Sequence, residues 1–157
     1  DLVNTLREEE LARLLYELAQ ERYSRRIARK IVEARRVSPI TTTQRLAQIV
    51  RDAIPRRGPR RIDPATRTFL ALRMCVNREL ESLSALLENA PALLGCGGRM
   101  AVISFQSMED RLVKQAFRSA QAAGMRILTP KPITPTDQEV QDNPRSRSAR
   151  MRVIQKL

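Results

Sequence analysis

Histidine is absent from the sequence of 157 residues, and cysteine occurs only at Cys75 and Cys96. Zinc sites draw most of their ligands from these two residue types, and two cysteines are too few for a disulfide scaffold. We therefore expect no metal site, and we interpret both cysteines as small buried hydrophobic residues. The lack of histidine also removes the side chain that most often acts as a general base near neutral pH.

Long apolar runs and aromatic residues are scarce as well. No apolar run is long enough to span a bilayer, and no signal peptide is visible. Aromatic residues make up 3% of the chain and hydrophobic residues 42%, so the core must be aliphatic. No helix carries the aromatic anchors of a membrane-surface segment, and we do not expect a membrane as a partner. Because the sequence begins at Asp1, we interpret it as a fragment or a processed product.

Acidic residues are also few in comparison with basic residues. The chain has 17 acidic and 29 basic residues, which gives a formal net charge of +12. Nearly all of the positive charge is arginine, since lysine occurs only at Lys30, Lys114, Lys131 and Lys156. Arginine makes forked hydrogen bonds to phosphate and stacks on bases. The composition therefore predicts a polyanionic partner.

The first part of the chain is predicted to be a small helical subdomain. Apolar residues recur with helical spacing in three successive segments, which predicts three amphipathic helices. A basic loop rich in proline and glycine follows at 55–62. This change of composition predicts a boundary between a helical subdomain, residues 1–60, and a second structural unit, residues 61–157.

The second of these helices, which follows Ser24, has an unusually basic polar face. This face has six basic residues, among them Arg25, Arg26 and Arg29, whereas the helix has only one acidic residue, Glu33. A solvated helix face would explain a few of these charges, but six exceed what solubility needs. We therefore expect this face to contact phosphate groups.

The remainder of the chain is predicted to alternate helices and strands. Asp63 and Pro64 are typical of a helix start, and an apolar stripe continues from there to Leu87. Met100–Ile103 is a continuous apolar run, which predicts a strand covered on both faces in a parallel sheet. A short strand is predicted at 125–128.

Ser107 is the predicted N-cap of the next helix, with Asp110 as its acidic partner. Open α/β folds bind ligands at the carboxyl ends of their parallel strands, so we expect the segment from Ser104 to Ser107 to face a ligand. An ordinary strand-to-helix connection is the open alternative.

The last stretch alternates from Ala149 onward. The pattern predicts a half-exposed strand with Met151 and Val153 on the buried face and with Arg150 and Arg152 on the exposed face. A charged edge strand resists aggregation, which would also explain these arginines.

Seven short stretches resemble the bacterial MraW/RsmH family and its mitochondrial relatives. They occur in order over nearly the whole chain, which makes the resemblance specific although each stretch alone is weak. The stretches are Asp1–Leu6, Ser24–Ala28, Pro39–Thr43, Pro64–Phe69, Val102–Phe105, Glu109–Arg111 and Asn143–Ala149. A generic basic RNA-binding protein would explain the charge but not these ordered stretches.

The resemblance implies a fold, an activity and a partner. The fold class would be α/β: the carboxyl half of a class I (Rossmann-like) methyltransferase domain, residues 61–157, plus an inserted all-helical subdomain, residues 1–60. The activity would be S-adenosylmethionine-dependent methylation of cytosine N4 in small-subunit ribosomal RNA. The partner would be that RNA or the small ribosomal subunit, and a homodimer is an open alternative. The location would be the cytoplasm of a bacterium or the mitochondrial matrix.

The sequence departs from the family pattern in two respects. The glycine-rich turn that holds the cofactor in the family is missing, so we expect no cofactor-binding residue in this chain. Asp63 and Gln106 occupy positions where the family usually has histidine, and glutamine cannot shuttle a proton. The alternative function is therefore a catalytically inactive, RNA-binding factor of small-subunit assembly with the same fold.

The predicted substrate-binding residues fall into three groups, and no catalytic residue is assigned. One group follows the Met100–Ile103 strand, another precedes and begins the last strand, and the third is the basic helix face. The residues are Ser104, Gln106, Ser107 and Arg111; Arg145, Arg147 and Arg150; and Arg25, Arg26 and Arg29. Arg145, Arg147 and Arg150 would hold RNA phosphates or brace the sheet.

Overall fold

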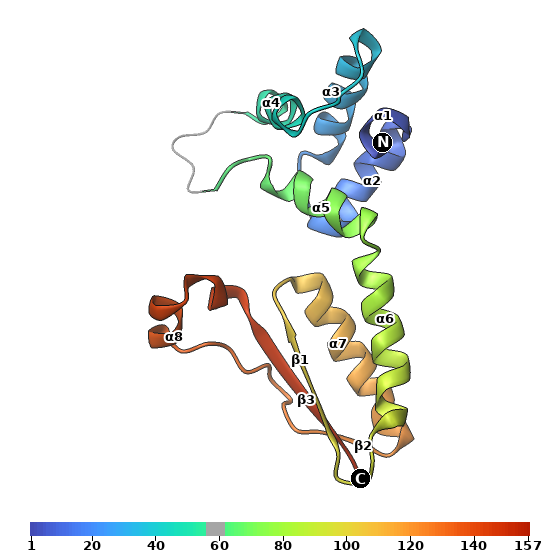
Figure 1. The fold of residues 1–157 in the computed structure, drawn as a ribbon, viewed down its shortest axis with the longest axis vertical. Coiled ribbons are helices and arrows are strands. Elements are labelled where there is room, and N and C mark those ends of the chain that lie inside the picture. Colours follow the sequence, from blue (N-terminus) through green and yellow to red (C-terminus); the bar gives the residue numbers. More distant parts are fainter. Residues whose placement is uncertain (56–61) are drawn as a thin grey trace. The chain divides into compact units, whose positions relative to one another are not determined.

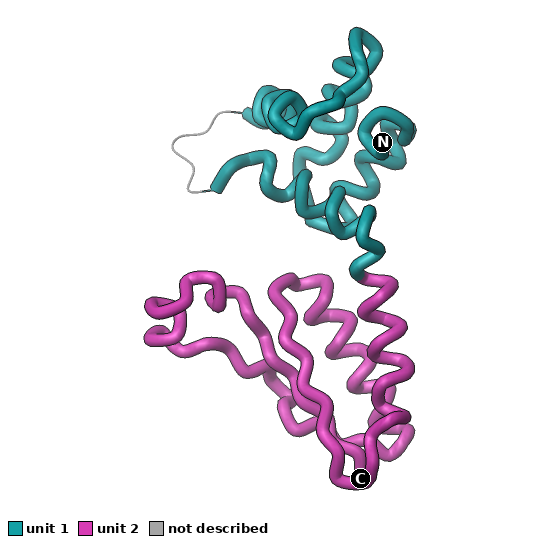
Figure 2. The backbone as a smooth tube through the Cα atoms, in the orientation of Figure 1, with its two compact units in different colours: residues 1–79 teal, residues 80–157 magenta. Residues whose placement is uncertain are grey.

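The computed structural model describes residues 1–55 and 62–157, so most of the loop predicted at 55–62 lies outside the described residues. The chain divides into two compact units, Asp1–Glu79 and Leu80–Leu157 (Figure 2). This division follows the packing of the described residues. The boundary near residue 60, expected from the change of composition and from the family resemblance, stays a prediction.

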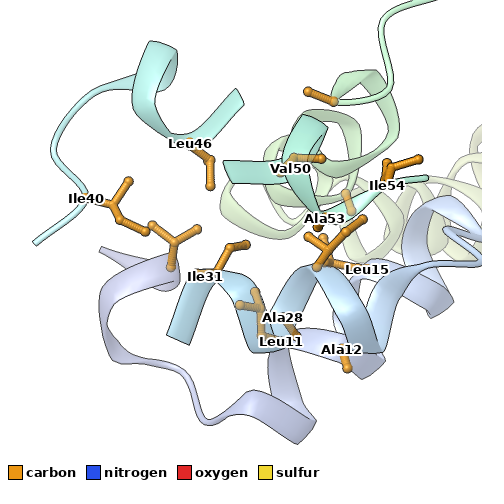
Figure 3. Packing of buried hydrophobic residues seen from close by; sticks show 14 residues of the cluster. Leu11, Ala12, Leu15, Ala28, Ile31, Ile40, Leu46, Val50, Ala53 and Ile54 are labelled. Carbon is orange, nitrogen blue, oxygen red and sulfur yellow. The ribbon is translucent and has the colours of Figure 1, made fainter. Parts of the chain in front are cut away.

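The first unit is helical. Its helices are α1 (Leu2–Thr5), α2 (Glu8–Ala19), α3 (Ser24–Val37), α4 (Thr43–Ala53) and α5 (Thr66–Val76) (Figure 1). The apolar stripes of α2, α3 and α4 meet in a core whose fully buried members include Leu11, Leu15, Ala28, Ile31 and Val50 (Figure 3). The three predicted amphipathic helices and the aliphatic core are confirmed.

The side chain of Asn4 forms hydrogen bonds that connect the start of the chain to the segment after α3. Its Nδ2 donates a hydrogen bond to the O of Ile40 at 2.8 Å, and its Oδ1 accepts one from the N of Ile40 at 2.9 Å. Ile40 is buried in the core. Both of its backbone polar groups are therefore satisfied by one side chain, as buried backbone groups require.

The single long helix predicted for residues 63–87 is wrong. It is divided into α5 and a second helix, α6 (Glu79–Asn89). Between them Arg78 has a left-handed φ of 51°, which a helix interior does not accept. The Glu79 carboxylate holds the break in place, because it accepts hydrogen bonds from Nε and Nη2 of Arg73 at 2.8 and 3.0 Å.

The second unit combines helices with a three-stranded sheet. After α6 its elements are η1 (Ala90–Leu93), β1 (Arg99–Ser104), α7 (Ser107–Ala120), η2 (Gln121–Ala123), β2 (Met125–Ile127), α8 (Asp137–Asp142), η3 (Pro144–Ser148) and β3 (Arg150–Lys156). The strand order is β1–β3–β2, and β3 is antiparallel to both neighbours (Figure 1). β1 and β2 therefore run parallel to each other and are joined through α7. The predicted mixed α/β class is confirmed.

The prediction that β1 is covered on both faces and paired in parallel is wrong. β1 pairs with the antiparallel β3, with Ser104 opposite Arg150. Met100 and Val102 pack in the core with α7, whereas Ile103 on the other face is 57% exposed. Within the described residues, only one face of this strand is covered.

The predicted direction of the side chains of β3 is also wrong. Ile154 is fully buried and Arg152 is 6% exposed, while Met151 and Val153 are only half-buried. The alternation is present, but its phase is the opposite of the predicted one. The reason is that α7 supplies a carboxylate, Asp110, against which the guanidinium of Arg152 is buried.

Two smaller findings complete the fold. Cys96 is exposed and Cys75 is half-buried, so the prediction that both cysteines are buried is wrong. Among the described residues, no helix combines the length and the apolar character that a membrane crossing needs.

The two hydrogen bonds of Asn4 make a testable prediction. Asn4→Ala leaves the buried N–H and C=O of Ile40 unpaired, and we expect it to lower the free energy of unfolding by about 1–3 kcal/mol. Asn89→Ala is the matched control, because its side chain is exposed and bonds only within its own helix; we expect a change within about 0.5 kcal/mol. Urea denaturation followed by circular dichroism measures both, and equal effects would contradict the role of Asn4.

Candidate functional site

Ser104, Gln106 and Ser107 lie where β1 ends and α7 begins. Ser104 is buried, and its Oγ donates a hydrogen bond to the O of Arg150 at 3.4 Å. This hydroxyl therefore joins the end of β1 to the start of β3. Ser107 is the exposed first residue of α7, and Gln106 is half-buried. A substrate contact of these three residues stays a prediction.

α7 is capped one residue earlier than predicted. The N-cap is Gln106 rather than Ser107, with an extended backbone at φ −124°. The acidic partner is Glu109 rather than Asp110, because Oε2 of Glu109 accepts hydrogen bonds from the N of Phe105 at 3.0 Å and the N of Gln106 at 3.2 Å. The cap leaves the carboxylate of Asp110 available for a different contact.

Asp110 forms the centre of a buried ion pair. Its Oδ1 accepts a hydrogen bond from Nε of Arg152 at 2.7 Å, and its Oδ2 accepts one from Nη2 of Arg152 at 3.2 Å. Nη1 of Arg150 also donates to Oδ2 at 3.2 Å. Asp110 is 7% exposed, so this contact of one carboxylate with two guanidinium groups lies largely out of water.

The arginines lower the pKa of Asp110 below its ordinary value. The hydrogen bonds from Arg152 are the main cause, and the charge of Arg152 and the contact with Arg150 act in the same direction. Burial opposes them, because it disfavours the charged form. Asp110 is therefore ionised at neutral pH and compensates the buried charge of Arg152.

Arg152 was not among the predicted site residues, since the sequence predicts it on the exposed face. The sequence nevertheless contained a signal for the burial of Asp110, the partner of Arg152. Asp110, Val113 and Phe117 are spaced as one face of a helix, and all three are buried. An acidic residue on a buried stripe requires a buried cation, because an unpaired charge there is very costly.

Arg150 is anchored on one side and open on the other. Its guanidinium donates to Asp110, yet its side chain is 47% exposed. A guanidinium has five N–H donors, so donors remain available to a ligand. An arginine fixed in this way loses less conformational entropy on binding phosphate than a free one does.

Arg145 and Arg147 are exposed on η3, the segment that leads directly into β3. Between them Ser146 is buried, and its Oγ donates to the O of Asn143 at 2.8 Å. The buried serine directs its two neighbours to the surface. Arg111 is exposed on α7. The structure brings Ser104 and Arg150 into contact and places Arg145 and Arg147 on the adjoining segment.

Arg25, Arg26 and Arg29 lie in the other unit, exposed along α3. They line a groove of about 900 Å³ between α2 and α3. Tyr16 and Tyr23 line it as well, and the sequence analysis did not single out either tyrosine. The signal for them was the rarity of tyrosine, since the whole chain contains only these two.

The glycine turn before β1 does not fit a cofactor site. The N of Gly97 donates to the O of Lys156, and the N of Lys156 donates to the O of Gly98, both at 2.9 Å. These groups continue the pairing of β1 with β3, so they do not cradle a ligand. Among residues 1–55 and 62–157, no group of three acidic, histidine or cysteine side chains could hold a metal ion.

Comparison with known proteins gives matches along the whole chain. The model of the MraW methylase family matches residues 1–157. The ribosomal RNA small subunit methyltransferase H of Anaplasma marginale (strain St. Maries) is 51% identical over 155 residues, which cover 99% of the chain and 53% of that protein. The protein of the same name from Cyanothece sp. is 51% identical over 157 residues, or 100% of the chain and 51% of that protein. The chain spans about half the length of the curated relatives it matches.

The buried ion pair predicts a loss of stability in acid. Because the folded-state pKa of Asp110 is depressed, the pair stabilises the folded protein above the unfolded pKa of about 4. This contribution is lost as the pH falls through the lower, folded-state pKa. Asp110→Asn leaves Arg152 buried without its counter-charge, and we expect it to cost about 3–5 kcal/mol at neutral pH. Urea denaturation at a series of pH values measures both effects.

Two further variants serve as controls for this prediction. Asp110→Asn combined with Arg152→Met removes both charges and retains the volume, so it should be less destabilising than Asp110→Asn alone. Glu88→Gln, an exposed change on α6, should alter stability by no more than about 0.5 kcal/mol. The account is wrong if Asp110→Asn and Glu88→Gln have the same effect at neutral pH.

Proposed function

The chain belongs to the MraW methylase family, and from this we propose that the protein containing it methylates small-subunit ribosomal RNA at the N4 amine of a cytosine, with S-adenosylmethionine as methyl donor. The observation that carries the proposal is the match along the whole chain. Because the chain spans about half of each relative, the activity is proposed for the protein as a whole.

The sheet of the second unit supports a Rossmann-like domain. β1, α7 and β2 form a strand–helix–strand connection between parallel strands, and the antiparallel β3 lies between them. Mixed sheets, in which an antiparallel strand accompanies parallel ones, are common among doubly wound folds. We propose that residues 61–157 are the carboxyl half of the methyltransferase domain and that residues 1–60 are its helical insert.

The chemistry of the proposed reaction is compatible with the absence of histidine. The lone pair of the cytosine amine is conjugated with the ring, so the site must orient the amine and exclude water. An amide can accept an N–H bond from the amine and donate one to the polar edge of the base. We assign this role to Gln106, with Ser107 beside it; the proton can leave after the methyl group has been transferred.

The exposed arginines of the second unit supply the RNA phosphate contacts in this proposal. Arg150 is held by Asp110, and Arg145 and Arg147 are exposed on the segment before it. Arg111 on α7 is exposed as well. Phosphate contacts of this kind fix the position of a nucleic acid, while contacts to the base select the nucleotide.

S-adenosylmethionine supplies an electrophilic methyl group when it is bound. The backbone of the Gly95–Gly98 turn pairs with β3 instead of cradling a ligand. We therefore place the donor site in the part of the relatives' length that this chain does not span. The reported relatives are bacterial, and we place the reaction in the cytoplasm, where bacterial ribosomes are made. The homodimer stays a prediction.

Calorimetric titration of S-adenosylmethionine into the complete natural protein, beside this 157-residue chain, tests the proposed activity. We expect the complete protein to bind the donor and to methylate isolated small-subunit RNA. The 157-residue chain alone should bind RNA but should not bind the donor. A complete protein that binds RNA but neither binds the donor nor transfers a methyl group would be an assembly factor. That result would overturn the proposed activity.

Arg150→Gln tests the phosphate contact of the second unit. Loss of one phosphate contact should lower the slope of log K against log salt by about 0.7 for a single-stranded RNA. Arg99→Gln is the matched control, since Arg99 is exposed at the opposite end of the β1–β3 pair, across from Gln155. Fluorescence anisotropy at several salt concentrations measures the slope. Equal slopes for the two variants would contradict the assignment.

A further inference from the structure

The groove between α2 and α3 is strongly basic. Five arginines and two glutamates are among its lining residues. Within the described residues, Arg13, Arg22, Arg25 and Arg26 form no ion pair with a carboxylate. Arg29 approaches Glu8 only at 3.7 Å, with 69% of its side chain exposed. With five arginines against two glutamates, the groove presents a net positive charge to solvent.

The same groove holds both tyrosines of the sequence. Tyr16 on α2 is 61% exposed, although aromatic residues make up only 3% of the chain. Tyr23 is half-buried just before α3, and the guanidinium of Arg22 lies 4.7 Å from the centre of its ring. One ring is thus already stacked on an arginine, while the exposed ring of Tyr16 remains accessible to a ligand.

We propose that this groove is a binding subsite for an unpaired RNA nucleotide, whose base stacks on Tyr16 while Arg25 and Arg26 hold the adjoining phosphates. Aromatic rings beside arginines are the usual means of binding single strands. In a duplex the faces of the bases are stacked on one another and inaccessible. The volume of about 900 Å³ lies in the range of ligand sites. The inference rests on the proposed RNA substrate and adds a contact distinct from the end of β1.

An acidic protein segment is the competing occupant, because it would also be attracted by the arginines. It would not require a ring at position 16. The exposure of Tyr16, in a chain that has so few aromatic residues, favours a ligand with a flat apolar face. Nucleic acid bases have such a face and are joined to phosphates, so RNA matches both features of the groove.

The test measures the binding of a fluorescein-labelled single-stranded RNA of about ten nucleotides to the full chain by fluorescence anisotropy. Tyr16→Ala should weaken binding by about 5- to 150-fold, the usual loss of one base stack. Tyr16→Phe keeps the ring and should bind as the unchanged chain does. Tyr16 is exposed on a helix surface, so both variants should fold, which circular dichroism verifies.

Two matched controls separate this groove from the rest of the basic surface. Val37→Ala removes an exposed apolar side chain at the end of the same helix, α3, and should leave binding unchanged. Arg26→Gln should lower the salt slope by about 0.7, whereas Arg118→Gln, an exposed change on α7 of the second unit, should not. The same RNA annealed to its complement should bind equally to the unchanged chain and to Tyr16→Ala.

The outcomes distinguish this inference from the proposed function. If Tyr16→Ala binds the single strand normally while Arg150→Gln binds it weakly, the groove is not a nucleotide site and the proposed function stands. If a polyglutamate peptide competes with the RNA and binds Tyr16→Ala unchanged, the occupant is an acidic segment and the inference is overturned. If Tyr16→Ala weakens binding but the complete protein transfers no methyl group, the inference stands and the proposed activity fails.

Discussion

A buried carboxylate between two arginines determines how the second unit is put together. Asp110 comes from α7, and Arg150 and Arg152 come from β3, so the contact joins elements about forty residues apart in the chain. A one-residue shift of β3 would turn Arg152 to the uncovered face and leave Asp110 buried without its main partner. The ion pair therefore selects which face of β3 packs against α7. It also fixes the position of Arg150, the arginine that remains half-exposed at the end of the sheet.

The arginines of the two units differ in their environment. In the second unit Arg152 is removed from water, and its charge is compensated by Asp110. In the first unit Arg25 and Arg26 stay exposed, without an ion pair among the described residues, on a helix whose buried face is apolar apart from Ser24. The net charge of +12 is thus not evenly spread. Part of it is internal structure, and part of it is available to a polyanion.

The structural elements that the sequence predicts best are those that depend on the local spacing of apolar residues. Helices α2, α3 and α4 follow from apolar stripes, and the mixed class of the second unit follows from the change between helical and strand patterns. The phase of β3 could not be predicted, because alternation gives a period but does not show which face is covered. The break near Arg78 was missed because the apolar stripe continues across it, although Val76 is 67% exposed. The N-cap was misplaced because serine is a more typical cap than glutamine.

The candidate site divides in the same way. The exposure of Arg150, Arg145 and Arg147 could be predicted from composition and from the end of a strand, while their contact with RNA stays a prediction. Arg152 could not, because its burial depends on a carboxylate forty-two positions away. Tyr16 was missed since a single tyrosine on an amphipathic helix is ordinary, and only the groove beside α3 distinguishes it. Both the burial of Arg152 and the position of Tyr16 in the groove depend on contacts between different helices and strands, which local spacing does not reveal.

Nuclear magnetic resonance of the arginine Nε–H groups tests the central claim, that Asp110 confines Arg152 to the interior and leaves Arg150 accessible for the proposed RNA contact. The signals of the two arginines are followed in the unchanged chain while a single-stranded RNA is added. We expect the Nε–H of Arg152 to exchange slowly with water and to keep its position, and the signal of Arg150 to shift. Fast exchange of the Arg152 group, or a shift of Arg152 while Arg150 stays unchanged, would contradict the account.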